Sequence, residues 1–294
     1  MTLFKDVPVS AVFKQNGTVY MKVSRSLKHE IKKYANTKAS PREECEVLEH
    51  AHFINGFKRE QWVNAKGQRH RTDGPALIEP DGYSEWWFEG LKHRTDGPAA
   101  IYPSGTVEWW VNGLLHRDDG PAVERVSGTK KWFQQGESHR DDGPACIWAN
   151  GRKEWYSNGK LHRVDGPAIE DADGLRMWYI NGKLHRLDGP AFIYADGREE
   201  WYQKGNRHRD GGPAVVWYNG QQEWWCRGKL HRTDGPAVES NNEGTMWYQK
   251  GKLHRVDGPA FIYADGREEW WLKGVRVTDP LTIMIISKSK LAVL

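Results

Sequence analysis

The sequence predicts an all-β fold, an elongated single-layer antiparallel meander of about nine to ten β-hairpin repeats of 23 residues, with a small N-terminal β-hairpin module. First, the string His-Arg-x-Asp-Gly-Pro-Ala recurs at a constant spacing of 23 residues. Second, Asp-Gly or Asn-Gly turns separate short β-prone runs that lack helical periodicity. Third, only 38% of the residues are apolar and the mean hydropathy is -0.80. Neighbouring repeats must therefore bury one another, because a deep central core is not available.

One repeat illustrates the others. Residues 182–190 are rich in turn-forming residues, 191–194 form a short β-prone run, Asp196-Gly197 is a turn and 198–203 form a second strand. A glycine three places before each histidine, such as Gly182, fits a hairpin position with positive φ. The histidines lie at His70, His93, His116, His139, His162, His185, His208, His231 and His254.

Three segments are expected. Residues 1–45 form a small basic module, with a β-hairpin around Asn16-Gly17 and a short helix over 27–34. Residues 46–276 form the repeat array, which begins with a degenerate repeat. Residues 277–294 form a C-terminal capping strand or tail, because Val277 stands where a tenth histidine would fall and an apolar run follows. That apolar strand covers the sheet edge or binds a partner.

Charge and cysteine content restrict the function. The net charge is +4, but residues 1–43 hold nine Lys or Arg against three Asp or Glu, and the rest of the chain holds 34 against 36. Long polynucleotides need a basic track, so the nearly neutral repeats argue against nucleic acid as their ligand. Three scattered cysteines form no CxxC pair, which argues against a disulfide framework or a cysteine zinc site. No apolar stretch has membrane-spanning length and no signal-peptide core is evident, so we expect a cytoplasmic protein.

The His-Arg-x-Asp set has three interpretations. His beside a carboxylate could perform acid–base catalysis, and His with Asp could bind a divalent metal. In the third, Asp caps the turn and pairs with Arg or His, forming a ladder from repeat to repeat. We favour the ladder and expect no catalytic residue, metal or cofactor, because all copies look alike and the repeat at Gly211 persists without the Asp. The best copies of this structural ladder are His93, Arg94, Asp96, His116, Arg117, Asp119, His162, Arg163, Asp165, His185, Arg186 and Asp188.

Aromatic pairs recur with the same period, and each begins with a tryptophan such as Trp201. Adjacent strand residues point to opposite faces, so one stripe should pack between repeats and the other should lie partly exposed. An exposed aromatic stripe suits protein contact, sugar stacking or base stacking, although both stripes could simply pack. The candidate binding stripe is Trp87, Trp110, Phe133, Tyr156, Tyr179, Tyr202, Trp225, Tyr248 and Trp271.

Segments such as 181–185, 195–197 and 200–202 resemble the MORN repeat, a 23-residue hairpin unit, and its YwqK-type bacterial variant. Here Arg-x-Asp-Gly-Pro-Ala replaces the usual His-Gly-x-Gly. Residues 3–24, with Phe13, Tyr20 and Lys22, look like a short module common on tailed-phage proteins. The resemblances imply an interaction scaffold acting in the host bacterial cytoplasm.

The expected function is thus that of a non-catalytic repeat scaffold that binds another protein. If the chain is encoded by a phage, we expect a counter-defence factor that inhibits or redirects a bacterial host protein. The alternatives are a nucleotide or nucleic-acid binder using the Arg and aromatic ladders, and a carbohydrate-binding virion protein. No unique nucleophile–base pair or phosphate loop points to an enzyme. The oligomeric state stays open.

Overall fold

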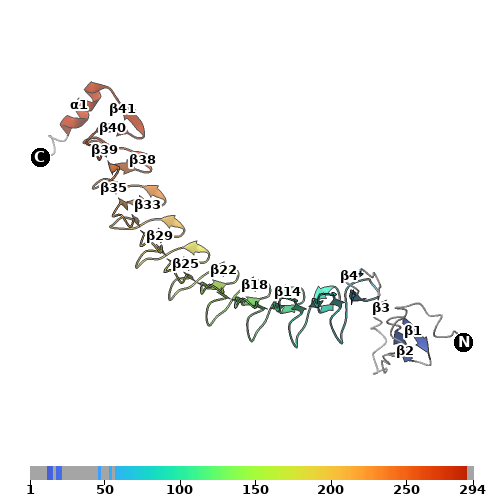
Figure 1. The fold of residues 1–294 in the computed structure, drawn as a ribbon. Coiled ribbons are helices and arrows are strands. Elements are labelled where there is room, and N and C mark those ends of the chain that lie inside the picture. Colours follow the sequence, from blue (N-terminus) through green and yellow to red (C-terminus); the bar gives the residue numbers. More distant parts are fainter. Residues whose placement is uncertain (1–11, 16–17, 22–45, 48–52, 55–56, 290–294) are drawn as a thin grey trace. The chain divides into compact units, whose positions relative to one another are not determined.

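The computed structural model describes residues 12–15, 18–21, 46–47, 53–54 and 57–289, and the side chains of residues 59–285. The chain divides into two compact units, residues 1–136 and 137–294, which are described separately. The predicted all-β class and the antiparallel meander of 23-residue hairpin repeats are confirmed. Within the described residues, the single helix is α1 (Pro280–Ser289) at the C-terminal end (Figure 1).

Each repeat contributes two strands to a main sheet and one separate two-stranded side hairpin. In the repeat around residue 200, β27 (Phe192–Ile193) pairs with β28 (Glu199–Glu200). Strand β28 then pairs with β31 (Val215–Val216) of the next repeat. The side hairpin pairs β29 (Tyr202–Gln203) with β30 (Asn206–Arg207). The sheet therefore grows by one β-hairpin per repeat, and the side hairpins follow beside it.

The single second strand expected over 198–203 was wrong, because the chain leaves the main sheet at Trp201. The Trp201 N–H donates to the Ala214 carbonyl in the main sheet at 2.7 Å, and its carbonyl accepts from the His208 N–H at 3.0 Å. One residue thus serves both ladders, and the strand is split into β28 and β29. Residues 183–184, expected to be turn, form a strand of the preceding side hairpin.

In the first unit, the main sheet is an open meander paired in sequence order. Its strands are β3 (Glu46–Val47), β6 (Glu60–Val63), β7 (Leu77–Ile78), β8 (Ser84–Glu85), β11 (Ala100–Ile101), β12 (Val107–Glu108), β15 (Val123–Glu124) and β16 (Lys130–Lys131). The side-hairpin strands are β4 (Phe53–Ile54), β5 (Phe57–Lys58), β9 (Trp87–Phe88), β10 (Leu91–Lys92), β13 (Trp110–Val111), β14 (Leu114–Leu115) and β17 (Phe133–Gln134).

The second unit repeats this pattern. Its main-sheet strands are β19 (Cys146–Ile147), β20 (Lys153–Glu154), β23 (Ile169–Glu170), β24 (Arg176–Met177), β27, β28, β31, β32 (Gln222–Glu223), β35 (Val238–Ser240), β36 (Gly244–Met246), β39 (Phe261–Tyr263) and β40 (Glu268–Leu272). The remaining strands are β18 (Glu137–Ser138), β21 (Tyr156–Ser157), β22 (Lys160–Leu161), β25 (Tyr179–Ile180), β26 (Lys183–Leu184), β29, β30, β33 (Trp225–Cys226), β34 (Lys229–Leu230), β37 (Tyr248–Gln249), β38 (Lys252–Leu253) and β41 (Val275–Val277).

The side hairpins close through two residues that both have positive φ. Lys204 and Gly205 show φ values of 50° and 84°. This is the type I′ geometry, which matches the twist of the paired strands and favours Asn-Gly. Asn181-Gly182 fits that preference, whereas Lys204 occupies the left-handed region at an energetic cost.

The core is thin and made largely of small residues. The alanine that ends each His-Arg-x-Asp-Gly-Pro-Ala string is buried, with Ala191 and Ala214 at 0% exposure. Ala191 donates to the Glu200 carbonyl at 2.9 Å and accepts from the Trp178 N–H at 2.8 Å, so it belongs to the main-sheet ladder. Because the alanine side chain is fully buried, a larger side chain here would need its neighbours to move apart.

The N-terminal hairpin expected around Asn16-Gly17 is found as β1 (Val12–Gln15) paired with β2 (Thr18–Met21). The helix expected over 27–34 lies outside the described residues.

At the other end, the capping strand expected within 277–294 was wrong. Among residues 277–289, which the structure describes, only Val277 is strand, as the last residue of β41 paired to β40, and the apolar run forms α1. Asp279 caps that helix by accepting the Thr282 N–H at 2.8 Å, and Pro280 provides a preset φ at its first position.

Candidate binding surface

The motif arginine stacks on a tryptophan that lies eight or nine residues before it. The Arg186 guanidinium carbon lies 4.2 Å from the centre of the Trp178 ring. Its Nε donates to the Asp188 carboxylate at 3.0 Å, and another nitrogen donates to the Pro190 carbonyl at 3.3 Å. A Cβ placed on Gly189 would lie 2.8 Å from the guanidinium carbon. The loop thus encloses its arginine between an indole face and a glycine.

The same arginine contact recurs along the described repeats. It is seen for Arg71, Arg94, Arg117, Arg163, Arg209, Arg232 and Arg255 over Trp62, Trp86, Trp109, Trp155, Trp201, Trp224 and Trp247. Arg209 keeps it although Gly211, with φ of 75°, replaces the aspartate. The stacking on tryptophan and the bond to the proline carbonyl are therefore sufficient to hold the loop.

The histidine links each repeat to the next. The Nδ1 atom of His185 accepts the Lys204 N–H at 3.1 Å, and Lys204 begins the turn of the following side hairpin. Because the partner is an N–H donor, the ring carries its proton on Nε2. The same bond reaches Glu89, Asn112, Gln135, Asn158, Asn181, Lys250 and Lys273 from His70, His93, His116, His139, His162, His231 and His254. Among the described motif histidines, His208 lacks a partner at Nδ1.

The residues proposed as a structural ladder occupy these positions. Arg94, Arg117, Arg163 and Arg186 pair with Asp96, Asp119, Asp165 and Asp188 at 2.7–3.0 Å, each within one loop. Hydrogen bonds from these arginines, and their charge, lower the pKa of each aspartate below the ordinary value. The Arg–Asp pairs therefore act inside a repeat, and the bonds from His93, His116, His162 and His185 act between repeats.

The candidate aromatic stripe is half-buried rather than free. Trp225 and Tyr202 donate to Glu223 and Glu200, each two residues earlier on the same strand face, at 2.8 and 2.6 Å. Trp87, Trp110, Tyr156 and Trp271 do the same to Glu85, Glu108, Glu154 and Glu269, whereas Tyr179 and Tyr248 face the sulfur atoms of Met177 and Met246. Phe133 is half-buried and has no polar atom on its ring. The polar tips of these side chains are thus engaged within the array.

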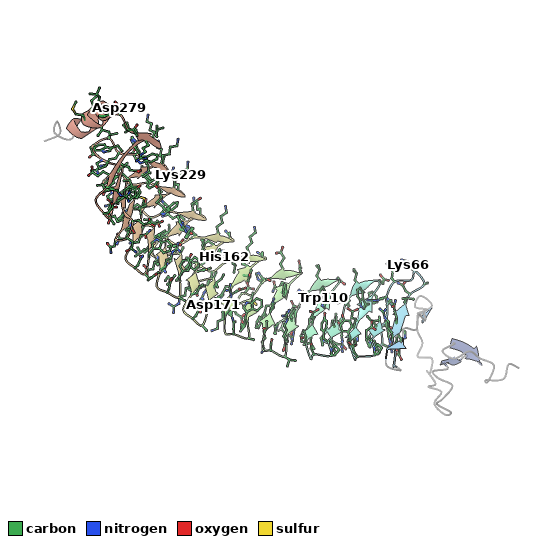
Figure 2. The ribbon with its side chains drawn as sticks, turned by 45° about the horizontal axis from the view of Figure 1, so that its top comes forward. Lys66, Trp110, His162, Asp171, Lys229 and Asp279 are labelled. Atoms are coloured by element: carbon green, nitrogen blue, oxygen red, sulfur yellow. The ribbon has the colours of Figure 1, made fainter. Side chains whose placement is uncertain are left out.

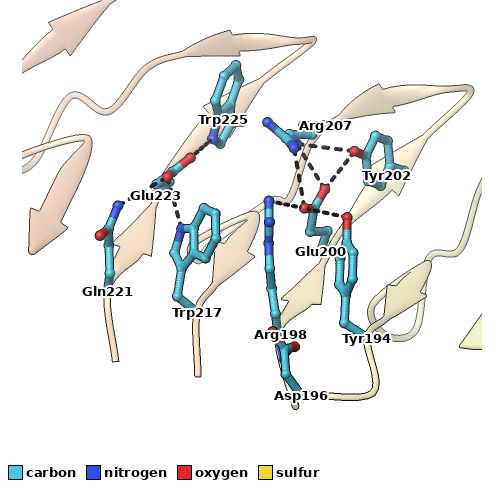
Figure 3. A network of polar contacts seen from close by, with 10 residues as sticks. All are labelled: Tyr194, Asp196, Arg198, Glu200, Tyr202, Arg207, Trp217, Gln221, Glu223 and Trp225. Carbon is cyan, nitrogen blue, oxygen red and sulfur yellow. Dashed lines mark hydrogen bonds and ion pairs between the residues drawn. The ribbon is translucent and has the colours of Figure 1, made fainter. Parts of the chain in front are cut away.

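A buried carboxylate lies at the centre of these contacts between aromatic side chains and glutamates. Glu200 is fully buried and accepts hydrogen bonds from Tyr194 at 3.1 Å and from Arg207 at 2.9 Å, with Arg198 also paired to it (Figure 3). Burial alone would raise the pKa of Glu200, but the bonds from Tyr202 and Arg207 and the arginine charges hold it below the ordinary value. Burial, and then Glu200, raise the pKa of Tyr202 to about 12. A carboxylate so fully bonded serves the fold, since no free oxygen faces a substrate.

The same contacts explain why some repeats have another residue in place of the glutamate. Glu85 accepts from Tyr83, since the residue six places before it is Glu79. In other repeats the residue six places before the glutamate is aromatic, as Tyr194 is for Glu200 and Trp217 for Glu223, and it donates to that glutamate. Where that earlier residue is Arg125, Asp171 or Ser240, the glutamate is replaced by Lys131, Met177 or Met246. The buried charge is present where two aromatic groups can satisfy it, as the cost of an unpaired buried charge requires.

Consecutive His-Arg-x-Asp-Gly-Pro loops are separated by open polar grooves. In the first unit, Asp96, Trp109 and Arg117 help to line a groove of about 620 Å³. In the second unit, Asp142, Trp155 and Arg163 help to line one of about 690 Å³. Both lie at equivalent positions, so the groove is a property of the repeat.

Each loop also presents one exposed side chain between its arginine and its aspartate. In the second unit, Val164 is 81% exposed and Leu187 is 74% exposed on consecutive loops. The residue at this tip varies among Thr72, Thr95, Asp118, Asp141, Val164, Leu187, Asp210, Thr233 and Val256. We call these nine residues the loop tips. Sequence reasoning missed them, although the signal was the single variable letter inside a constant motif.

Within residues 59–285, no group of three His, Cys, Asp or Glu side chains is arranged to hold a metal ion. In the described part of the chain, no helix has the length and apolar character to cross a membrane. Comparison of the chain with models of protein families and with curated proteins finds no match, so the surfaces above stand on their own geometry.

Proposed function

We propose that this chain is a non-catalytic repeat scaffold that binds another protein through its loop tips and the grooves between them. One observation supports this most: a uniform loop, held by Arg–Trp stacking and the Pro carbonyl, carries an exposed tip residue that is Thr, Asp, Val or Leu in different loops. Apolar side chains exposed on neighbouring loops can together form the kind of patch that marks a protein contact site. Val164, which lines a polar groove, and Leu187 on the next loop are the anchors we assign in the second unit.

A second part of the proposal concerns the kind of protein to which the repeats belong and where it acts. The repeat resembles the MORN unit and its YwqK-type variant, and the N-terminal residues resemble a module of tailed-phage proteins. We therefore propose a MORN-like phage factor that acts in the bacterial cytoplasm and inhibits or redirects a host protein, such as one involved in defence.

The test is affinity purification from bacterial lysate, followed by mass spectrometry, with two matched variants. Val164→Asp with Leu187→Asp should abolish recovery of a stoichiometric partner, because charge replaces the apolar tips without touching the core. Tyr218→Asp is the control, since Tyr218 is 71% exposed in the same unit but lies at a turn of the main sheet. Recovery of no stoichiometric partner by the unaltered chain, or equal recovery by tip variant and control, contradicts the proposal.

A further inference from the structure

The side hairpins of the second unit gather positive charge at their turns. The turn residues that flank each positive-φ glycine include Lys204, Arg227 and Lys229, all exposed. The full set, which we call the cationic ridge, is Lys160, Lys183, Lys204, Arg227, Lys229, Lys250, Lys252 and Lys273. In Figure 2, Lys229 lies at the edge formed by the side hairpins, and Asp171 lies at the opposite edge.

Consecutive hairpins bring these cations into one row. The Gly205 N–H donates to the Leu184 carbonyl of the preceding hairpin at 2.9 Å, and Gly251 bonds Leu230 in the same way. The carbon atoms of Lys183 and Lys229 lie 3.7–3.9 Å from a Cβ built on Gly205 and Gly251. Each lysine stem therefore rests over the next glycine. Two main-sheet strands per repeat set a spacing of about 9–10 Å along the row.

No negative charge interrupts the ridge. The side hairpins described from Tyr156 to Val277 contain no Asp or Glu. The ridge cations have no ion-pair partner among the side chains that the structure describes. Apart from Glu137, whose side chain rests over Gly159 at the start of the row, the carboxylates of the unit lie elsewhere: Asp165 and Asp188 are exposed on the loops, and Glu200 is buried in the sheet. The nearly neutral composition of the repeats thus conceals a segregated charge.

We infer that the cationic ridge is a binding site for the sugar–phosphate backbone of single-stranded nucleic acid. Seven of its eight members are lysines, which act as mobile point charges suited to phosphate contact. The ridge turns carry no apolar anchor between Lys160 and Lys273, whereas the cores of protein interfaces are enriched in aromatic residues and depleted in lysine. This favours phosphate over an acidic protein.

The single-stranded form follows from the geometry of the row. A rigid duplex winds away from a row of cations and meets it only where its backbone crosses. A flexible single strand can follow the row and place a phosphate near each cation. The aromatic stripe does not provide base stacking here, because residues such as Trp225 and Tyr202 are half-buried and their polar tips are bonded to Glu223 and Glu200. Binding should therefore depend on charge and salt and be indifferent to base sequence.

The test measures binding of the full chain to a labelled oligothymidylate over a range of salt concentrations. Lys229→Gln with Lys252→Gln removes two ridge cations, and Lys153→Gln with Arg176→Gln removes two exposed cations from β20 and β24 of the same unit. For two lost phosphate contacts the slope of log K against log salt should fall by about 1.4, with an affinity loss of about 25-fold near 0.1 M salt. The control pair should bind like the unaltered chain.

The N-terminal module, which is also basic, is present in every variant and cannot create a difference between the two pairs. Competition adds a second readout: unlabelled oligothymidylate should displace the label better than a duplex or polyglutamate of equal charge. The inference is overturned if the ridge pair and the control pair bind alike, or if polyglutamate or the duplex competes as well as the single strand.

Discussion

Replacing Gly189 with alanine should destabilise the array only when Arg186 is present. The new Cβ would lie 2.8 Å from the Arg186 guanidinium carbon, so the guanidinium must leave its place on Trp178. The stacking contributes about 0.5–2 kcal/mol. The hydrogen bond to the Pro190 carbonyl adds about 1.5–3 kcal/mol, whereas water screens the pair with the exposed Asp188. Gly189→Ala should lose part of this sum, about 1–3 kcal/mol.

The effect of Gly189→Ala on stability should change sign in a chain that already carries Arg186→Ala. There the new methyl meets no guanidinium, and alanine restricts the unfolded chain more than glycine does. Gly189 has no positive φ, so the substitution should then stabilise by about 0.4–1 kcal/mol. Native-state hydrogen exchange over residues 178–204 measures this, because repeat arrays open locally.

Gly197 supplies the control for this cycle. It has φ of 87° and open space around it, so Gly197→Ala should cost about 1–2 kcal/mol whether or not Arg186 is present. If Gly189→Ala costs the same free energy in both backgrounds, the enclosure of the guanidinium by the glycine does not hold the loop, and the reasoning fails.

Three further outcomes are expected. His185→Ala should lower the local stability near the Lys204 turn by about 0.5–1.5 kcal/mol, as measured by hydrogen exchange. His185→Asn should restore part of that stability, because its Oδ1 can accept the Lys204 N–H. The pKa of Glu200 is lowered on folding. The stabilisation it gives is therefore present above its ordinary pKa of 4.5 and is lost as the pH falls through the lower folded value. The urea midpoint of unfolding should fall with acidification, and less steeply in Glu200→Gln. Asp279→Ala should remove the cap on Thr282 and weaken α1 by about 1 kcal/mol, seen as faster amide exchange in α1 alone.

Some of the site could have been predicted from the sequence. The constant motif with one variable letter already marks the loop tips, and the Lys or Arg beside each hairpin glycine already marks the ridge once repeats are aligned. The position of the aromatic partners could not be predicted. Whether Trp225 is free or bonded depends on Glu223, two residues earlier on the same strand face, and on the side chains such as Trp217 that pack around that glutamate in the folded sheet.

The sequence by itself determined the 23-residue period, the hairpin turns and the all-β class, because glycine, Asn-Gly and Gly-Pro act on the backbone locally. It also held an unused signal at Asp279-Pro280, the start of α1, which the β-branched run after it obscured. Only the tertiary structure decided that Trp201 divides one strand into two, and that the cations of the side-hairpin turns from Lys160 to Lys273 lie in one row. Both depend on pairing between repeats, and pairing across about 23 residues is set by packing rather than by local preference.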